Sequence, residues 1–429
     1  MTPQEDATLA SALEAIRTGG GPFDDQEFIA KLTGQVKEKA INGKILYSAG
    51  HPGPTSVKVD AYHRLSEMGG KGPASAVGAP GSQIVYRRRG EGKGSDLWLL
   101  GALGIVSTRS DLLERLLAYH DESAGLAALR VYKDGDWRTV CVDDQMPCHG
   151  RLKLAYSSNE QPRNGPVSLV LKALAKLYGC YEVLKAGRLG SALEDLTGGF
   201  KDKLYLRDGV RAGPNQDGPP KQPDISIAEE MASGVLWARL SALHSGGHLL
   251  GATYKPKYAH LGGAPAIDTS VLEAGEALTY PIVGMKEVSD ASGGGRYVQL
   301  RNPWKQIGEG TNAKQWEGAW GSSREGAAEW SNLPGVAAEL GGRPREADGR
   351  FWMTFEDFVE GFNKVRPIAL PIALPCLTAP LLSPPSGSHL PPDRGRAMDA
   401  PSGRSRRVVA RDGRRQGGHA TWAGGAVAA

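Results

Sequence analysis

The sequence predicts an α+β fold with two lobes, a helical lobe followed by a β-rich lobe. Amphipathic helical segments recur between residues 86 and 212, and runs typical of strands, such as LTYPIVGMKEV and RYVQLRNPW, follow a further helix after residue 224. The polar, turn-rich segment GPNQDGPPKQP at 213–223 reads as the linker between them. A chain of 429 residues with 40% hydrophobic residues can bury a core in each lobe.

The elements of the first half are predicted in order from their patterns. Residues 1–85 form a partly ordered arm that opens with a short amphipathic helix and continues in glycine- and proline-rich loops. In the helical lobe, 86–212, the block DLWLLGALGIVSTRSDLLERLLAYH has helical spacing interrupted near 107–110. Asp134-Gly135 between two β-rich runs predicts a hairpin, and PVSLVLKALAKLYGCYEVLKAG predicts a helix stopped by Gly187.

The β-rich lobe is predicted over 224–365. It opens with one helix, IAEEMASGVLWARLSALHSGG, and continues in strands that include GRFWMTFEDF. Residues 366–429 are first proline-rich and then rich in arginine and glycine, which predicts a largely disordered tail. A mispredicted exon is an alternative explanation for this tail.

Composition limits the compartment and the partners. Four cysteines, none in a CxxC pair, favour a reducing compartment and disfavour a zinc site. The N-terminal segment has no apolar signal core and no window approaches 18 apolar residues, so we expect a cytoplasmic protein without a membrane span. From Pro391 onward the chain has eight arginines and three aspartates, a charge of 8 − 3 = +5, whereas the whole chain has a net charge of +4. The rest of the chain is therefore near neutral, and we predict no nucleic-acid partner.

Five segments resemble, in the same order, the core of the calpain-type cysteine proteases. They are GSDLWLL, DGDWRTVCVDDQMP, LAKLYGCYEVLKAG with LEDLTGG, VQLRNPW and DGRFWMTFEDF, and they lie within residues 91–365. The resemblance implies a papain-like fold of two lobes with a peptide-binding cleft between them.

The resemblance also assigns catalytic positions. A cysteine protease needs a thiolate at a helix N-terminus, an imidazole that takes its proton and a group that orients the imidazole. The cysteine position falls on Leu97, and the sequence has no cysteine before Cys141. The histidine position falls on Leu278, or on Glu276 if the local gap is drawn differently, whereas the orienting asparagine is retained as Asn302.

Three neighbours complete the expected cleft, and one further position bears on the oxyanion. Asp96, Trp98 and Trp304 match residues of the family's cleft motifs. The glutamine that helps to bind the oxyanion in this family falls on Glu91. An ionised carboxylate donates no hydrogen bond and would repel a developing oxyanion.

The calcium ligands implied by the resemblance are mostly replaced. Glu194 and Asp348 remain as acids, and the other positions carry Arg88, Gln315, Ser322 and Arg350. Because Ca²⁺ needs several anionic or carbonyl oxygens, we expect no bound ion unless the residual sites bind weakly, and no other cofactor.

Two functions follow from these positions. The first is an inactive calpain-like pseudoprotease that binds a protein or an extended peptide. The second is an active calcium-dependent cysteine endopeptidase, as family membership alone implies. Loss of the nucleophile and base costs on the order of 10⁶ in turnover, which favours the inactive form.

Other candidate residues have simpler explanations. Ser95 has no base and is expected to serve the helix entry. Cys141 and Cys180 are expected in the core, His244 and His248 as exposed imidazoles at a turn rather than a metal site, and Asp143-Asp144 as caps of a turn. The tryptophans of the second lobe are expected in its core rather than on a binding surface: Trp304, Trp316, Trp320, Trp330 and Trp352.

Overall fold

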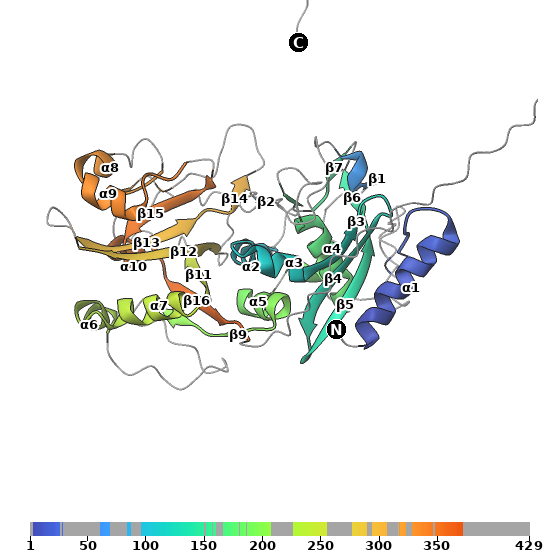
Figure 1. Ribbon diagram of the computed structural model, residues 1–429, viewed down its shortest axis with the longest axis horizontal. Coiled ribbons are helices and arrows are strands. Elements are labelled where there is room, and N and C mark those ends of the chain that lie inside the picture. Colours follow the sequence, from blue (N-terminus) through green and yellow to red (C-terminus); the bar gives the residue numbers. More distant parts are fainter. Residues whose placement is uncertain are drawn as a thin grey trace, which may run out of the picture. The chain divides into compact units, whose positions relative to one another are not determined.

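The computed structural model describes the parts of the chain that form the two lobes and the start of the arm. These parts are residues 3–25, 28, 61–68, 84–86, 96–149, 152–156, 158–159, 166–179, 181–185, 187–206, 226–254, 277–289, 294–306, 316, 318–322, 328–345 and 348–371. All of them belong to one compact unit, Met1–Leu382. The mixture of helices and sheets confirms the predicted α+β class (Figure 1).

The arm contributes a helix and two short strands. The predicted N-terminal helix is α1 (Pro3–Gly19), which packs against β5 (Asp136–Asp143). Its apolar side chains Leu9, Ala12, Leu13 and Ile16 join a cluster with Cys141. Further along, β1 (Ala61–Arg64) precedes the 3₁₀ helix η2 (Leu65–Glu67), and β2 (Ile84–Tyr86) follows.

The first lobe combines helices with a three-stranded antiparallel sheet. Its remaining elements are α2 (Leu97–Val106), α3 (Ser110–Leu116), β3 (Leu117–Asp121), β4 (Leu126–Lys133), β6 (Gln145–His149), β7 (Lys153–Leu154), β8 (Ser158–Asn159), α4 (Val167–Tyr178), the 3₁₀ helix η4 (Tyr181–Lys185) and α5 (Leu189–Thr197). The sheet has the order β3-β4-β5. Asp134 and Gly135 have φ of 54° and 87°, as the two-residue turn between β4 and β5 requires.

Three local predictions for the helices are corrected. The block after Leu97 is interrupted at 107–109 as predicted, but its last residues form β3 instead of continuing α3. The next helix, α4, ends at Gly179 with φ of 118°, well before Gly187. The single helix predicted at the start of the second lobe is two, α6 (Ile227–Ala232) and α7 (Val235–Ser245), separated at Gly234 with φ of 74°.

The second lobe is built on a seven-stranded sheet. Its strands are β9 (Phe200–Lys201), β10 (Leu204–Tyr205), β11 (Leu249–Tyr254), β12 (Leu278–Val288), β13 (Gly295–Arg301), β15 (Arg350–Thr354) and β16 (Lys364–Ala369). The order is β10-β16-β11-β12-β13-β15, and β9 pairs with β16. The predicted strand GRFWMTFEDF is β15 only as far as Thr354; the hydroxyl of Thr354 caps α10 (Phe355–Gly361).

The predicted end of this lobe at Val365 is wrong by at least four residues. The strand β16 continues to Ala369 and is hydrogen-bonded to β11 from Thr253 to Leu249. Residues 366–369 therefore belong to the sheet and not to the tail. The predicted linker at 213–223 and the tail beyond residue 371 lie outside the described residues.

A second apolar cluster covers one end of this sheet. Trp320 and Trp352 are buried in it, beside Val336 and Leu340 of α9 (Pro334–Leu340), and α8 (Ala328–Asn332) contributes Trp330 at its edge. Trp316 is also buried, in the main core. The expectation that these tryptophans are core residues is confirmed for Trp316, Trp320 and Trp352, whereas Trp330 is only partly buried. The side chain of Trp304, in β14 (Trp304–Gln306), lies outside the described residues.

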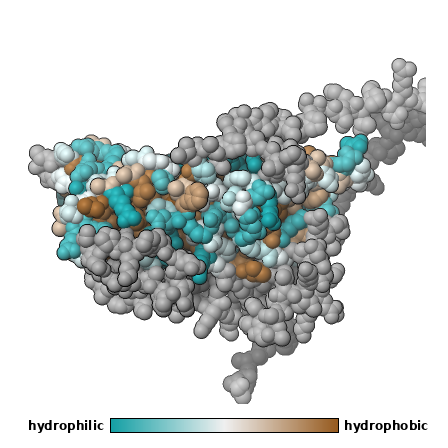
Figure 2. All heavy atoms as spheres, turned by 90° about the horizontal axis from the view of Figure 1, so that it is seen from below, coloured by the Kyte–Doolittle hydropathy of each residue, from teal (hydrophilic) through white to brown (hydrophobic). Residues whose placement is uncertain are grey.

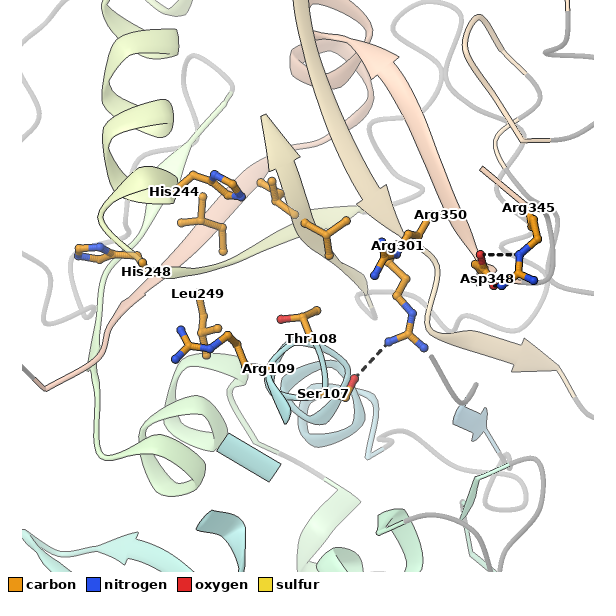
Figure 3. A pocket seen from close by; sticks show the side chains of 14 residues that line it. Ser107, Thr108, Arg109, His244, His248, Leu249, Arg301, Arg345, Asp348 and Arg350 are labelled. Atoms are coloured by element: carbon orange, nitrogen blue, oxygen red, sulfur yellow. Dashed lines mark hydrogen bonds and ion pairs between the residues drawn. The ribbon is translucent and has the colours of Figure 1, made fainter. Parts of the chain in front are cut away.

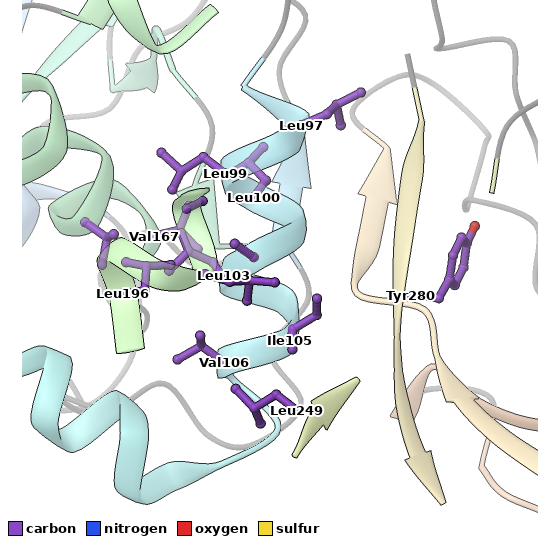
Figure 4. Close-up of a cluster of buried hydrophobic side chains, with 14 of the residues drawn as sticks. Leu97, Leu99, Leu100, Leu103, Ile105, Val106, Val167, Leu196, Leu249 and Tyr280 are labelled. Carbon is purple, nitrogen blue, oxygen red and sulfur yellow. The ribbon is translucent and has the colours of Figure 1, made fainter. Parts of the chain in front are cut away.

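The main hydrophobic core continues from one lobe into the other through α2 (Figure 4). Nearly every residue of α2 is buried, and the helix packs against α5 on one side and against β11 and β12 on the other. Gly101 allows this approach, because a Cβ added there would lie 3.1 Å from Cβ of Thr279 on β12. The two lobes therefore share α2 as a common packing element.

The surface of the described part carries few exposed large apolar side chains. They are Leu152, Val183, Phe200 and Val235. On the face shown in Figure 2, apolar residues form small areas among hydrophilic ones. None of the described helices is both long and apolar enough to span a bilayer.

Candidate active site

The sequence-predicted positions Leu97, Leu278 and Asn302 come from three elements that meet at one end of the sheet. Leu97 is the first residue of α2, and Leu278 is the first residue of β12. Because β13 runs antiparallel to β12 and ends at Arg301, Asn302 lies at the same end as Leu278. Residues 302 and 303 lead directly into β14, which pairs in parallel with β2 from the arm.

Leu97 is a core side chain. It is 3% exposed and belongs to the main hydrophobic cluster. It lies one helical turn before Gly101, which contacts Thr279, so both residues are on the side of α2 that faces β12. Figure 4 shows the Leu97 side chain at the N-terminal end of α2, directed to that side.

Leu278, on β12, is buried in the hydrophobic core as Leu97 is on α2. It is 4% exposed and belongs to the same cluster, next to Thr279, which contacts Gly101 of α2. Its backbone is paired with Tyr254 of β11. Each leucine therefore serves packing between α2 and the sheet.

Asn302 is buried and held by the backbone. Its N–H donates a hydrogen bond to the carbonyl oxygen of Gly349 at 2.7 Å, and Gly349 has φ of 66°. Asn302 as a whole is 1% exposed. The retained polar residue thus lies at the same end of the sheet as Leu278, with no imidazole at residue 278 to orient.

Two neighbours of Leu97 fix the start of α2. Asp96 is fully buried, and its carbonyl oxygen accepts hydrogen bonds from the N–H groups of Leu99 and Leu100, each at 2.9 Å. The indole of Trp98 donates to the carbonyl oxygen of Leu184 at 2.9 Å. It also lies against the backbone of Gly187, where a Cβ could not be accommodated. Trp98 therefore ties α2 to the segment that follows α4.

Several predicted positions lie outside the described residues. These are Arg88, Glu91, Ser95, Cys180, Glu276 and Gln315, and the side chain of Trp304.

The two acids proposed as calcium remnants each contact a basic side chain. Glu194, on α5, forms a short ion pair with Lys201 of β9. Asp348 accepts two hydrogen bonds from Arg345, from Nε to Oδ2 at 3.2 Å and from Nη2 to Oδ1 at 3.1 Å. The guanidinium of Arg345 thus binds the Asp348 carboxylate in the bidentate manner typical of arginine.

A third basic side chain, Arg343, contacts Ser322, which stands at another expected calcium-ligand position. Ser322 is buried, and its backbone carbonyl oxygen accepts hydrogen bonds from Nε and Nη2 of Arg343, at 3.2 and 2.7 Å. Arg350, at a position where an acid is expected, is exposed at the start of β15. Hard divalent cations need several oxygens that are not already bonded to cations. The described residues of the second lobe therefore do not fit calcium, and the described parts of both lobes contain no group of three His, Cys, Asp or Glu residues placed to hold a metal.

These basic partners were not identified from the sequence. The signal is the cluster of three arginines in GGRPREADGR at 341–350, around the retained Asp348. Lys201 carries no comparable signal, because its contact with Glu194 depends on the pairing of β9 with β16.

The two histidines are partly buried, not exposed as expected. His244 lies in the last turn of α7, and its imidazole is hydrogen-bonded to the backbone of Val283; burial lowers its pKa. Nδ1 of His248 is buried without a hydrogen-bond partner among the described residues. No third ligand joins them in the described part of the chain.

The pair Asp143-Asp144 does more than cap a turn. Asp143 does accept a hydrogen bond from the N–H of Gln145 at 2.9 Å, but both carboxylates are buried. Asp143 forms an ion pair with Lys172 of α4, and Asp144 one with Arg64 of β1. Burial raises the pKa of Asp144, and the nearby Arg64 opposes that shift. The pair joins the arm and α4 to β5.

The thiols of the described part lie on β5 and β6 and not on α2. Cys141 on β5 and Cys148 on β6 are reduced and buried, which confirms Cys141 as a core residue. At the meeting point of α2 and β12 the side chains of Leu97 and Leu278 have no ionisable atom. These two side chains can pack, but neither can attack an amide or accept a proton.

Residues 87–368 match the family described as calpain family cysteine protease. The chain is 30% identical over 277 residues to the "Calpain-type cysteine protease DEK1" of Arabidopsis thaliana, covering 64% of this chain and 11% of the relative. It is 28% identical over 281 residues to the "Calpain-1 catalytic subunit" of Gallus gallus, covering 64% and 34%, and 29% identical over 276 residues to "Calpain-8" of Homo sapiens, covering 63% and 33%. The match therefore spans about a tenth of the plant relative and about a third of the animal ones.

Proposed function

The chain belongs to the calpain family of cysteine proteases, and we propose that it is a member that does not cleave peptide bonds and instead binds a protein or an extended peptide. The observation that carries the proposal is the burial of Leu97 and Leu278 at the positions where the family's cysteine and histidine are expected. A thioester-forming mechanism needs a thiolate and a base within hydrogen-bond reach, and two aliphatic side chains supply neither.

The remaining features cannot compensate for this loss. Asn302 can orient an imidazole, but residue 278 has none to orient. Removal of a nucleophile and its base leaves at best roughly 10³–10⁴ over the uncatalysed rate, from binding and oxyanion contacts. The carboxylate of Glu91, at the oxyanion position, would lower even this remaining rate enhancement.

We also propose that the protein works without calcium. Glu194 is paired with Lys201, and Asp348 with Arg345, so each remaining acid already has a cation from the same chain. Arg343 occupies the carbonyl oxygen of Ser322, another position expected near the ion. An added Ca²⁺ would have to displace these groups and would meet the repulsion of Arg350.

The alternative is an active calcium-dependent cysteine endopeptidase. Family membership and the retained Asn302 support it. The two functions are separated by incubating the purified chain with casein, with and without calcium. We expect intact casein in both samples and a complex that survives gel filtration when a binding peptide is supplied; casein fragments that depend on calcium would contradict the proposal.

A further inference from the structure

A cavity of about 480 Å³ lies at the C-terminal end of α2, the end opposite to Leu97 (Figure 3). One wall is Ser107, Thr108 and Arg109, which follow α2 directly. The facing wall comes from β13 and β15, with Arg301 and Arg350. Its volume falls within the range of ordinary small-molecule sites.

The lining of this cavity is strongly basic. It contains four arginines, at 109, 301, 345 and 350, and a single acid, Asp348, which gives +3 with neutral histidines. Asp348 is already bonded to Arg345 through both of its oxygens. Arg109 is held by Asp111 at 2.7 Å, outside the lining. A concave wall of one sign concentrates the field of its charges.

Two of these arginines are neighbours on adjacent strands of the sheet. Arg301 and Arg350 are directly paired in the antiparallel register of β13 and β15. Opposite residues of such a pair project on the same face, and like charges there destabilise the sheet. A fold that needed only packing would not place two guanidinium groups at this position.

Burial increases the cost of this arrangement. Arg301 is 3% exposed, and its Nη1 donates to Oγ of Ser107 at 3.3 Å. Burial first, and then the charge of Arg350, lowers the pKa of Arg301 to about 10, against the opposing effect of Asp348. The guanidinium is still charged at neutral pH, so an anion between Arg301 and Arg350 would relieve both the desolvation and the repulsion.

The opposite side of the cavity offers a further polar group and an apolar surface. Nδ1 of His248 is buried without a partner among the described residues. Figure 3 shows His248 and His244 on the side away from Arg301 and Arg350, with Leu249 between them and Arg109. Leu250 and Ile282 add buried aliphatic surface to the lining. The cavity thus has a basic side with Arg301 and Arg350, and an opposite side where aliphatic side chains lie beside the two histidines.

We propose that this cavity is a binding site for a small organic phosphate, with the phosphate groups between Arg301 and Arg350 and the organic part against Leu249, Leu250 and Ile282. Guanidinium groups bind phosphate oxygens in a bidentate manner, and a lining charge of +3 matches a ligand with several negative charges. This proposal does not depend on the absence of proteolysis, because neither Leu97 nor Leu278 lines the cavity, although Arg301 directly precedes Asn302.

Isothermal titration of the full chain at low ionic strength tests the site, with pyrophosphate, ATP and succinate as three separate probes. We expect pyrophosphate to bind, ATP to bind at least as tightly because its organic part reaches Leu249, Leu250 and Ile282, and succinate to bind about tenfold more weakly or not at all. Binding of pyrophosphate should weaken as salt is added.

Variants locate the binding within the cavity. Arg350→Gln removes an exposed guanidinium from the site and should weaken pyrophosphate binding about tenfold. Arg239→Gln removes an exposed guanidinium from α7, outside the lining, and should leave binding unchanged. Circular dichroism and melting temperature confirm that both variants are folded.

Three results would overturn the proposal. One is the absence of heat with pyrophosphate and ATP for the folded wild-type chain. Another is an equal loss of binding in Arg350→Gln and Arg239→Gln, which would mean that only the overall charge matters. The third is binding of succinate as tight as that of pyrophosphate, which would exclude phosphate recognition.

Discussion

Leu97, the first residue of α2, and Leu278, the first residue of β12, are buried in the same hydrophobic cluster, with exposures of 3% and 4%. One side chain comes from the first lobe and the other from the second. At the positions where the family is expected to carry out its chemistry, this chain therefore has two buried aliphatic side chains of a core that both lobes share. The replacement of the expected cysteine and histidine by leucines should affect the stability of the protein and its reactivity.

Leu97→Ala should destabilise the protein by about 2–5 kcal/mol, because it removes a buried side chain and leaves a cavity. Urea unfolding followed by tryptophan fluorescence measures the loss. Leu100→Ala, in the same helix and fully buried, should behave alike. Val235→Ala, at a residue that is 54% exposed, should change the free energy of unfolding by less than about 0.5 kcal/mol. A neutral Leu97→Ala would show that Leu97 is not a core residue.

Lys172→Met should be strongly destabilising, by about 3–5 kcal/mol, because it leaves the buried Asp143 carboxylate without its cation. Lys172 and Asp143 are almost fully buried, and the ammonium also donates to the carbonyl oxygen of Gln145 at 2.7 Å. The matched control is Lys201→Met, which breaks an exposed pair with Glu194 and should cost less than about 1 kcal/mol. Equal urea midpoints for the two variants would contradict the expected role of the buried pair.

His120 should make stability fall as the solution is acidified. Burial lowers its pKa below 6.5, against the opposing charges of Glu122, Asp144 and Asp121. Between the folded and unfolded pKa values the unfolded chain binds more protons, so stability is lost as pH falls through that window below about 6.5. We expect the melting temperature of His120→Gln to depend less on pH between about 7.5 and 5.5 than that of the wild type. If the difference in melting temperature between His120→Gln and the wild type is the same at every pH in this range, His120 is excluded as a source of the effect.

Calcium should not stabilise the chain. A site that binds the folded state raises the free energy of unfolding by about 2.7 kcal/mol when calcium is at a hundred times its dissociation constant. Because Glu194 and Asp348 are already paired with Lys201 and Arg345, we expect equal melting temperatures in millimolar calcium and in millimolar magnesium. A rise of several degrees that is specific to calcium would mean that the ion displaces these internal cations.

The sequence predicted the elements whose patterns are local. The Asp134-Gly135 turn, the interruption after α2 and the strands β12 and β13 depend on residues close in the chain, and all are confirmed. The misplaced boundaries share a cause: Gly179 and Gly234 end helices with positive φ although the apolar pattern continues past them. The strand β16 was missed because its apolar, proline-containing sequence is typical of loops, and pairing with β11 overrides that preference.

The candidate site was only partly accessible from the sequence. Motif order assigned Leu97, Leu278 and Asn302, and the structure brings these positions to one end of the sheet. Their burial depends on the close approach of α2 to β12 at Gly101, which no local pattern reveals. The cations at Glu194 and Asp348, and the pairing of Arg301 with Arg350, likewise arise from residues that tertiary structure or sheet register brings together.

The most direct test of the central claim is the rate at which a thiol-reactive epoxide labels Leu97→Cys, with and without Leu278→His, measured by intact mass. If the two positions are those of the nucleophile and the base, the double variant should be labelled about a hundredfold faster than Leu97→Cys alone, and the wild type should not be labelled at residue 97. Folded variants that react at the same rate would contradict the assignment of these positions. Calcium-stimulated peptide cleavage by the wild type would contradict the loss of activity itself.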